Sequence, residues 1–178
     1  MKELAGFPKA TQAKTNSCWA CASRMIVNWY NGRKNRVTRY ESDQAIANAW
    51  GAKMGDEYKS LDVQRSASGL LIDLGYSNNT DGRPKPTISE IEKAIVIDQK
   101  PLLANVAPGN PGNTPNLKVK NDGHWVVIVG VDVDTSKLKV FDPGIGAFRE
   151  VDYGNEYDRQ EGEARYWQNT SYVDDLSS

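Results

Sequence analysis

The apolar residues of this chain follow a helical spacing up to about residue 98 and a strand pattern from residue 101 onward. In the first part, the apolar runs begin after capping residues and end near glycines, as helices in globular proteins do. In the second part, short β-branched runs are separated by turn residues. Helices first and strands second indicate an α+β domain, in which helices pack against an antiparallel sheet.

These patterns divide into segments of ordinary length. We expect helices over residues 17–30, 42–50, 60–74 and 87–98. We expect strands over residues 101–106, 124–133, 138–141, 148–151 and 164–173. The polar lead-in 1–15 is expected to be extended, and Gly, Pro and Asn in 77–87 and 108–115 predict loops. A chain of 178 residues without an internal repeat has the size of one domain, so residues 1–178 are predicted to form a single domain.

The charge and hydropathy patterns argue against two classes of partner. The chain has 22 Lys and Arg against 23 Asp and Glu, without a basic stripe, so we expect no nucleic acid. No stretch reaches the roughly 18 apolar residues of a membrane span, so we expect no membrane partner. The N-terminus carries no apolar signal segment, which predicts a cytosolic chain, another export route or a domain excised from a longer chain.

The chain contains two cysteines, Cys18 and Cys21, and one histidine, His124. A Cys–His mechanism therefore has one possible base and at most two possible nucleophiles. Cys18 lies in the first turn of the first expected helix, where unpaired N–H groups and positive potential favour a thiolate. Cys21 lies one turn later between alanines, and we expect it to be a small buried core residue.

The Cys18-x-x-Cys21 spacing has two other interpretations. A thioredoxin-like redox pair should follow a buried strand closely, whereas polar residues precede Cys18, so this interpretation is the weaker one. A zinc site would need about two further ligands, and the chain offers no further cysteine and one histidine. We therefore expect neither a metal nor a cofactor, and we keep the redox protein as an alternative.

His124 opens a β-branched run after the turn-forming Asn121-Asp122-Gly123. A hairpin from 124 to 142, with its turn near 134–137, would bring Asp142 close to His124. The carboxylate would then hold the ring in the required tautomer and stabilise the imidazolium. A buried core histidine and a plain Asp142-Pro143-Gly144 turn are the simpler interpretations of the same residues.

Four pieces of the sequence together resemble papain-like cysteine peptidases: Gln12, Ser17-Cys18-Trp19, Gly123-His124-Trp125 and Asp142-Pro143. In that family a glutamine six residues before the nucleophile donates to the oxyanion, and Gln12 stands at that offset from Cys18. The family's cysteine opens the long helix, and its histidine opens a later strand. The Cys-Gly expected before the nucleophile is replaced by Thr15-Asn16, so the chain differs from papain itself.

The nearer resemblance is to compact bacterial members, which include peptidase domains of bacteriocin-exporting transporters and papain-fold effectors injected into other cells. It implies a papain-like fold, with N-terminal helices packed on a C-terminal antiparallel sheet. It implies that Cys18, His124 and Asp142 are catalytic and that Gln12 joins the Cys18 backbone N–H in the oxyanion hole. Trp19, Gly123 and Trp125 become candidates for the substrate cleft.

The implied function is hydrolysis of peptide bonds in a protein or peptide substrate. Three other activities would use the same residues, so the sequence does not separate them from a peptidase. They are a deamidase, an amidase acting on cell-wall peptides and a transglutaminase-like acyl transferase. A degenerate binding module with this fold is the non-enzymatic alternative, and the retained site residues count against it. The absence of a signal segment and of an evident inhibitory propeptide predicts a toxin or effector domain, delivered into a target cell and neutralised beforehand by a cognate immunity protein. Processing of a leader peptide is the alternative.

Overall fold

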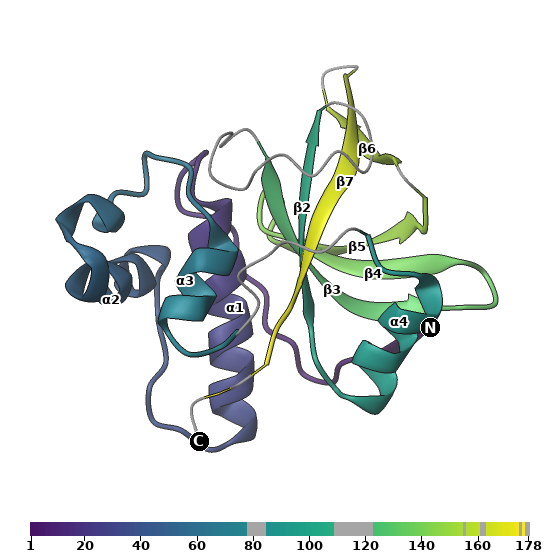
Figure 1. Ribbon diagram of the computed structural model, residues 1–178, viewed down its shortest axis with the longest axis horizontal. Helices are drawn as coiled ribbons and strands as arrows, with labels where there is room; N and C mark the ends of the chain where they lie inside the picture. The colour runs from purple at the N-terminus through teal and green to yellow at the C-terminus, as the bar shows by residue number, and fades with distance from the viewer. Residues whose placement is uncertain (78–84, 109–122, 155, 161–162, 175, 177–178) are drawn as a thin grey trace.

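The computed structural model describes residues 1–77, 85–108, 123–154, 156–160, 163–174 and 176. The predicted loop 108–115 lies outside the described residues except for Pro108, which ends strand β2 (Leu102–Pro108) instead. Most of the predicted loop 77–87 and Asn121-Asp122 before His124 also lie outside the described residues. Within the described part, the first three α-helices gather at one side of the sheet, and the fourth lies apart from them, beside the strands (Figure 1). The predicted α+β class is therefore confirmed.

The helices follow the predicted order. They are α1 (Cys18–Arg33), α2 (Asp43–Met54), α3 (Ala67–Asp73) and α4 (Ile88–Glu92), with a 3₁₀ turn at Asp56–Lys59 and a π-helical turn at Lys93–Ile97. Thr87 begins α4 with a complete capping box to Glu90, as its sequence predicts. Gly75 adopts a positive φ of 84° directly after the end of α3, which is the conformation that stops a helix.

The predicted helix 60–74 is confirmed only in its second half. The helix begins after Ser66, whose side chain accepts a hydrogen bond from Gly69 N and so caps α3. The preceding residues form a turn at 61–62 and irregular backbone up to Ser66, and the carbonyls of Val63 and Arg65 accept hydrogen bonds from tryptophan side chains instead of from a helical turn. Helical spacing alone does not reveal these distant donors.

Seven strands form one antiparallel sheet. They are β1 (Lys2–Glu3), β2 (Leu102–Pro108), β3 (His124–Asp132), β4 (Lys137–Asp142), β5 (Ala147–Asp152), β6 (Glu156–Gln160) and β7 (Glu163–Tyr172). Their order is β5-β4-β3-β2-β7-β6, and β1 adds to β3. The five predicted strands are confirmed, and β1 and β6 are additional. Both lie in polar segments without apolar alternation, so only their hydrogen bonds to neighbouring strands define them.

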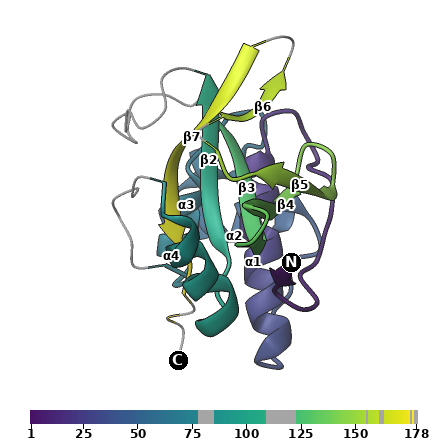
Figure 2. The same cartoon turned by 90° about the vertical axis from the view of Figure 1, so that its right-hand side faces the viewer.

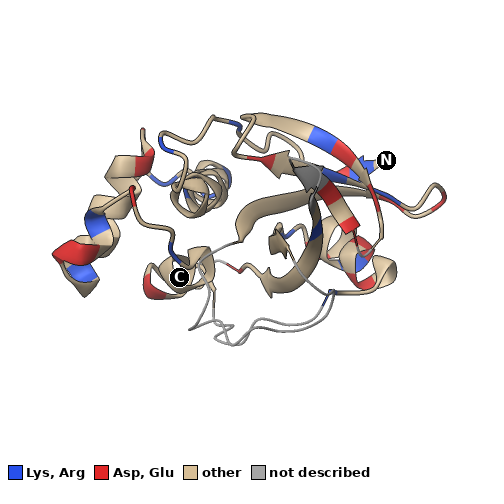
Figure 3. Ribbon diagram, turned by 90° about the horizontal axis from the view of Figure 1, so that it is seen from above, with Lys and Arg blue, Asp and Glu red and all other residues tan. Residues whose placement is uncertain are grey.

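Helix α1 is the centre of the molecule. It packs against α2 and α3 on one side and against β3 on the other, and Figure 3 shows it end-on between them. Trp19, Ile26 and Val27 have no exposed surface, because α1 meets neighbours all round. Because α1 packs on β3, the first residue of α1 lies beside the first residue of β3. Figure 2 shows that β6 and β7 project beyond the helices at the top of the sheet.

Along the described part of the chain, Lys and Arg as well as Asp and Glu are spread over helices and strands (Figure 3). Within the described residues, none of the helices combines the length and the apolar character that crossing a bilayer demands.

Candidate active site

The start of α1 leaves its first N–H groups without a side-chain cap. Ser17 is the N-cap residue, but its hydroxyl accepts from Lys14 N at 2.9 Å and lies 3.0 Å from Lys14 O. That hydroxyl is therefore engaged within its own loop. The orphan N–H groups of the first turn remain, together with the positive end of the helix dipole, beside the buried thiol of Cys18.

A bulge in β3 puts His124 and Asp142 on the same face of the sheet. The β3–β4 register shifts between Ile128 and Gly130, and Val129 O accepts instead from Leu4 N at 2.8 Å. Beyond the bulge, Val127 faces Phe141, so Asp142 falls opposite Val126 and shares the face of His124. Without the extra residue, Asp142 would face Val127 and its side chain would point to the other face.

The His124 and Asp142 side chains form a close pair. His124 Nε2 lies 2.6 Å from Asp142 Oδ1. Burial alone would lower the pKa of His124, but hydrogen bonds with Asp142 and with Cys18 outweigh it and raise the pKa to about 9. Burial would raise the pKa of Asp142, but the hydrogen bond and charge of His124 hold it at about 2. At neutral pH the pair is therefore an imidazolium beside a carboxylate.

Cys18 acts on the same imidazole as Asp142, because a hydrogen bond with its side chain also raises the pKa of His124. Because Asp142 takes Nε2, the ring's other nitrogen is the one left for the interaction with Cys18. The hairpin of β3 and β4 thus supplies the imidazole and its carboxylate, and α1 supplies the thiol. Three side chains that are far apart in the sequence meet in the order that a Cys–His–Asp mechanism needs.

Gly144 packs directly on this pair. Its N–H donates to Asp142 Oδ1 at 2.9 Å. A Cβ at this position would lie 3.2 Å from that oxygen and 3.4 Å from the Cε1 atom of His124, tighter than most side-chain contacts. The Asp142-Pro143-Gly144 turn signal is therefore real, and its glycine permits the close approach of the imidazole. Sequence reasoning assigned no role to Gly144.

The three predicted cleft residues occupy buried or crowded positions. Trp19 is fully buried and Trp125 is 4% exposed, and their indoles donate to Val63 O and Arg65 O, each at 3.1 Å. Both tryptophans therefore hold the backbone of the segment before α3 through these hydrogen bonds. Gly123 lies against the Asn105 side chain, which occupies the space that a Cβ would need.

Gln12 connects the two halves of the site through its backbone. Its N–H donates to Pro143 O at 3.0 Å, which links the segment before Cys18 to the turn after Asp142. Its side-chain nitrogen donates to Lys14 O and Thr15 O at 2.8 and 2.7 Å. The side-chain oxygen is buried and has no hydrogen-bond partner among the described residues. As an oxyanion donor, the amide would have to exchange one of these two carbonyls for substrate.

Cys21 has the buried position expected for it. It has no exposed surface, and its Sγ donates to Ala10 O at 3.4 Å. Burial, reinforced by the nearby Asp43, raises its pKa to about 12, so Cys21 stays a thiol at neutral pH. Both cysteines are free.

Asp43, a buried residue at the start of α2, also holds the loop before Cys18. Its Oδ2 accepts from Ala13 N at 2.7 Å and lies 3.3 Å from Ser17 Oγ, while its Oδ1 lies 3.1 Å from Arg24 Nε. Sequence reasoning missed this residue, because Asp at a helix start is explained by the helix dipole alone.

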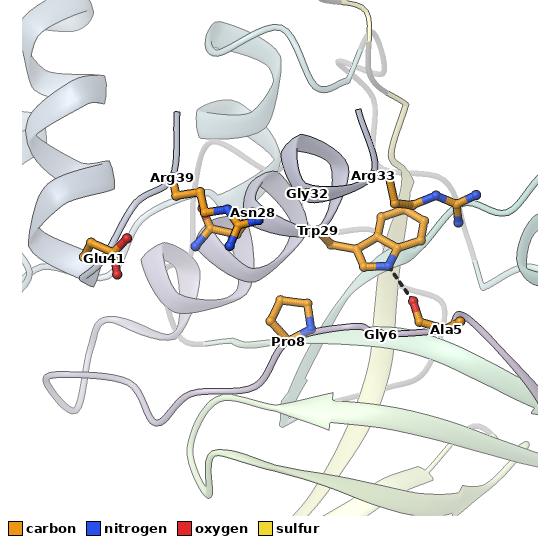
Figure 4. A pocket seen from close by; sticks show the side chains of 9 residues that line it. All are labelled: Ala5, Gly6, Pro8, Asn28, Trp29, Gly32, Arg33, Arg39 and Glu41. Atoms are coloured by element: carbon orange, nitrogen blue, oxygen red, sulfur yellow. Dashed lines mark hydrogen bonds between the residues drawn. The ribbon is translucent and has the colours of Figure 1, made fainter. Parts of the chain in front are cut away.

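A pocket of about 420 Å³ lies apart from these groups, between the N-terminal segment and the second half of α1 (Figure 4). Trp29 on its wall follows Cys18 by eleven residues, which is about 16 Å along the helix. Its Asn28 amide is engaged by the backbone of Tyr40, and its Trp29 N–H by Ala5 O. The pocket brings no nucleophile or base together. Across the described part of the chain, no group of three or more His, Cys, Asp or Glu could hold a metal ion.

Comparisons with known proteins agree with this geometry. The sequence model of one protein family, described as "Peptidase_C39 like family", matches residues 4–175. The match spans Gln12, Cys18, His124 and Asp142. None of the curated proteins matches the chain.

Proposed function

This chain belongs to the peptidase C39-like family of papain-like cysteine peptidases, and on that premise we propose that it hydrolyses peptide bonds with Cys18 as nucleophile, His124 as base and acid, and Asp142 as the group that orients His124. The observation that carries the assignment is the 2.6 Å contact between His124 Nε2 and Asp142 Oδ1, with Cys18 engaging the same ring. A structural histidine would need only one such partner.

The proposed reaction begins from a thiolate–imidazolium pair. The Cys18 thiolate attacks the scissile carbonyl carbon, and the carbonyl oxygen becomes an oxyanion. His124 gives its proton to the leaving amine, the C–N bond breaks, and an acyl-enzyme thioester remains. His124 then takes a proton from water, which attacks the thioester and releases the acid. Asp142 stabilises the imidazolium in the charged states and stays ionised throughout.

The oxyanion hole is proposed to use the Cys18 backbone N–H and the Gln12 side chain. The support for Cys18 N–H is that Ser17 leaves the first turn uncapped, so a donor with helix-dipole polarity is free beside the sulfur. The support for Gln12 is its offset from Cys18 and its backbone link to Pro143, which bring it to the same end of the site.

The proposed substrate is a protein of a target cell, reached after delivery by a route other than a classical signal peptide, with a cognate immunity protein that blocks the producer's own enzyme. The support is the resemblance to injected papain-fold effectors. Cleavage of a leader peptide, as by peptidase domains of bacteriocin exporters, is the competing role within the same family of folds.

Mass spectrometry of protein termini tests the proposed function. The active protein and Cys18→Ala are each incubated with a lysate of candidate target cells, and newly formed termini are compared. New termini formed by the active protein alone support a peptidase. Conversion of glutamine or asparagine to the acid without new termini would instead identify a deamidase, and equal patterns in both samples would refute the assignment.

A further inference from the structure

The carboxylate of Asp142 accepts hydrogen bonds on both oxygens. Oδ1 takes His124 Nε2 and Gly144 N, as described above. Oδ2 lies 3.3 Å from Arg149 Nη1 on β5 and accepts from the Tyr157 hydroxyl on β6, also at 3.3 Å. Burial raises the pKa of Tyr157, so its hydroxyl stays protonated and remains a donor. The catalytic role proposed above explains the partners of Oδ1 and leaves those of Oδ2 unexplained.

The two partners of Oδ2 are themselves fixed. Arg149 Nη1 also donates to Asp158 Oδ2 at 2.8 Å, and Asp158 is bound by Nε and Nη2 of Arg165 on β7 at 2.6 and 2.5 Å. The guanidinium groups of Arg149 and Arg165 lie 5.5 and 5.7 Å from the centre of the Tyr157 ring. One charged network therefore joins strands β4, β5, β6 and β7 and ends on Asp142.

We propose that Arg149 and Tyr157 are positioning residues that act through Asp142: by holding Oδ2, they keep Oδ1 directed at His124. A carboxylate rotates readily about its last side-chain bond, so a single hydrogen bond does not fix its plane. Donors on both oxygens do. Because Asp142 is 3% exposed, water does not replace a missing partner easily. The inference rests on the function proposed above, since it concerns how that site is held.

Arg149 also contributes charge to the pair. Its hydrogen bond is among the causes that lower the pKa of Asp142. Removing Arg149 therefore has two opposed effects on the pKa of His124: the loss of a nearby positive charge raises it, and the loss of the hydrogen bond that orients Asp142 lowers it. The other groups facing the pair stay in place: Cys18 from α1, Tyr157 and Asp158 from β6, and Arg165 from β7, which still neutralises Asp158.

The sequence offers a direct readout, because His124 is the only histidine. Protein labelled in its histidine ring therefore gives the NMR titration of one imidazole, without assignment ambiguity. We would measure it in a Cys18→Ser background, which removes thiolate ionisation, for Arg149→Met, Arg149→Lys and Tyr157→Phe. Arg33→Met on α1 is the matched control, because Arg33 contacts Trp29 and Gln99, away from the pair.

Tyr157→Phe removes a donor to Oδ2 without changing the charge, so it should lower the His124 midpoint by about half a pH unit and lower kcat in the Cys18 protein. Arg149→Lys keeps the positive charge without the planar fork and should also lower the midpoint. Arg149→Met loses the charge as well, so its midpoint should lie above that of Arg149→Lys. Arg33→Met should leave the midpoint unchanged.

The alkaline limb of kcat/KM should move with the NMR midpoint in the Cys18 protein, while KM stays the same. A purely structural role would lower the melting temperature without moving either midpoint, and this result in Arg149→Lys and Tyr157→Phe would overturn the inference. The titration needs no substrate. A shifted midpoint in a protein without peptidase activity would refute the proposed function and leave the coupling of Arg149 to the pair intact.

Discussion

Replacing Asp142 by alanine is expected to remove most of the stabilisation of the imidazolium. The pKa of His124 is raised from 6.5 to about 9, against a burial effect that lowers it, and Asp142 is the largest of the raising causes. A shift of this size corresponds to about 3 kcal/mol. If Asp142 supplies most of it, the loss is about 2 to 3 kcal/mol, which lowers kcat/KM by roughly 30- to 150-fold near pH 8.

The assay is the pH dependence of kcat/KM for a peptide that the enzyme cleaves, measured for the parent, Asp142→Ala and Asp142→Asn. The alkaline limb of the parent should lie near pH 9, where the imidazolium of His124 loses its proton. In Asp142→Ala the limb should fall below about pH 7. Asp142→Asn should retain part of the activity, because an amide also orients an imidazole. An Asp142→Ala enzyme with its limb still near pH 9, or within threefold of parental activity, would refute the reasoning.

Three further predictions follow from the same site. Iodoacetamide at mildly acidic pH should label Cys18 far faster than Cys21, because the buried Cys21 thiol has a pKa of about 12. Cys21→Ala should keep the activity that Cys18→Ala loses, and equal labelling of the two cysteines would point to redox chemistry. Gln12→Ala should lower kcat about 100-fold or more with little change in KM; an unchanged kcat would remove Gln12 from the site. In a Cys18→Ser background, the contribution of His124 to the free energy of unfolding should be full below about pH 6.5 and should be lost as the pH rises through the folded-state pKa of His124. That pKa should lie below about 9 in this background, because Cys18 no longer helps to raise it, and the Cys18→Ser, His124→Gln protein should lack the decline in urea titrations.

The hairpin that carries His124 and Asp142 shows how much of the site can be predicted from the sequence. The β-branched run, the turn and the second strand are predictable from residue type, and all three are found. The bulge near Val129 is not predictable, because it depends on a hydrogen bond with Leu4 far away in the chain. Yet this bulge decides the face on which Asp142 lies. The sequence predicts the pairing, and a long-range contact sets the register.

The supporting groups of the site illustrate the same limit. Arg149 lies in a predicted strand, and Tyr157 lies in β6, which the sequence did not predict. The proposed role of both residues depends on where β5 and β6 lie relative to Asp142. Asp43 looks like an ordinary helix start. In each case the residue type is common and its partner is distant, so local propensity carries no signal. The proposed nucleophile and base could be singled out from the sequence because the chain has only two cysteines and one histidine.

The most direct test of the central claim is the turnover of a cleaved peptide by His124→Ala, measured beside the parent and Cys18→Ala with new peptide termini followed by mass spectrometry. Removal of His124 leaves no other histidine in the chain to carry the proton. The mechanism predicts that His124→Ala and Cys18→Ala are both inactive, although each remains folded by circular dichroism. Hydrolysis by His124→Ala at the parental rate would contradict it.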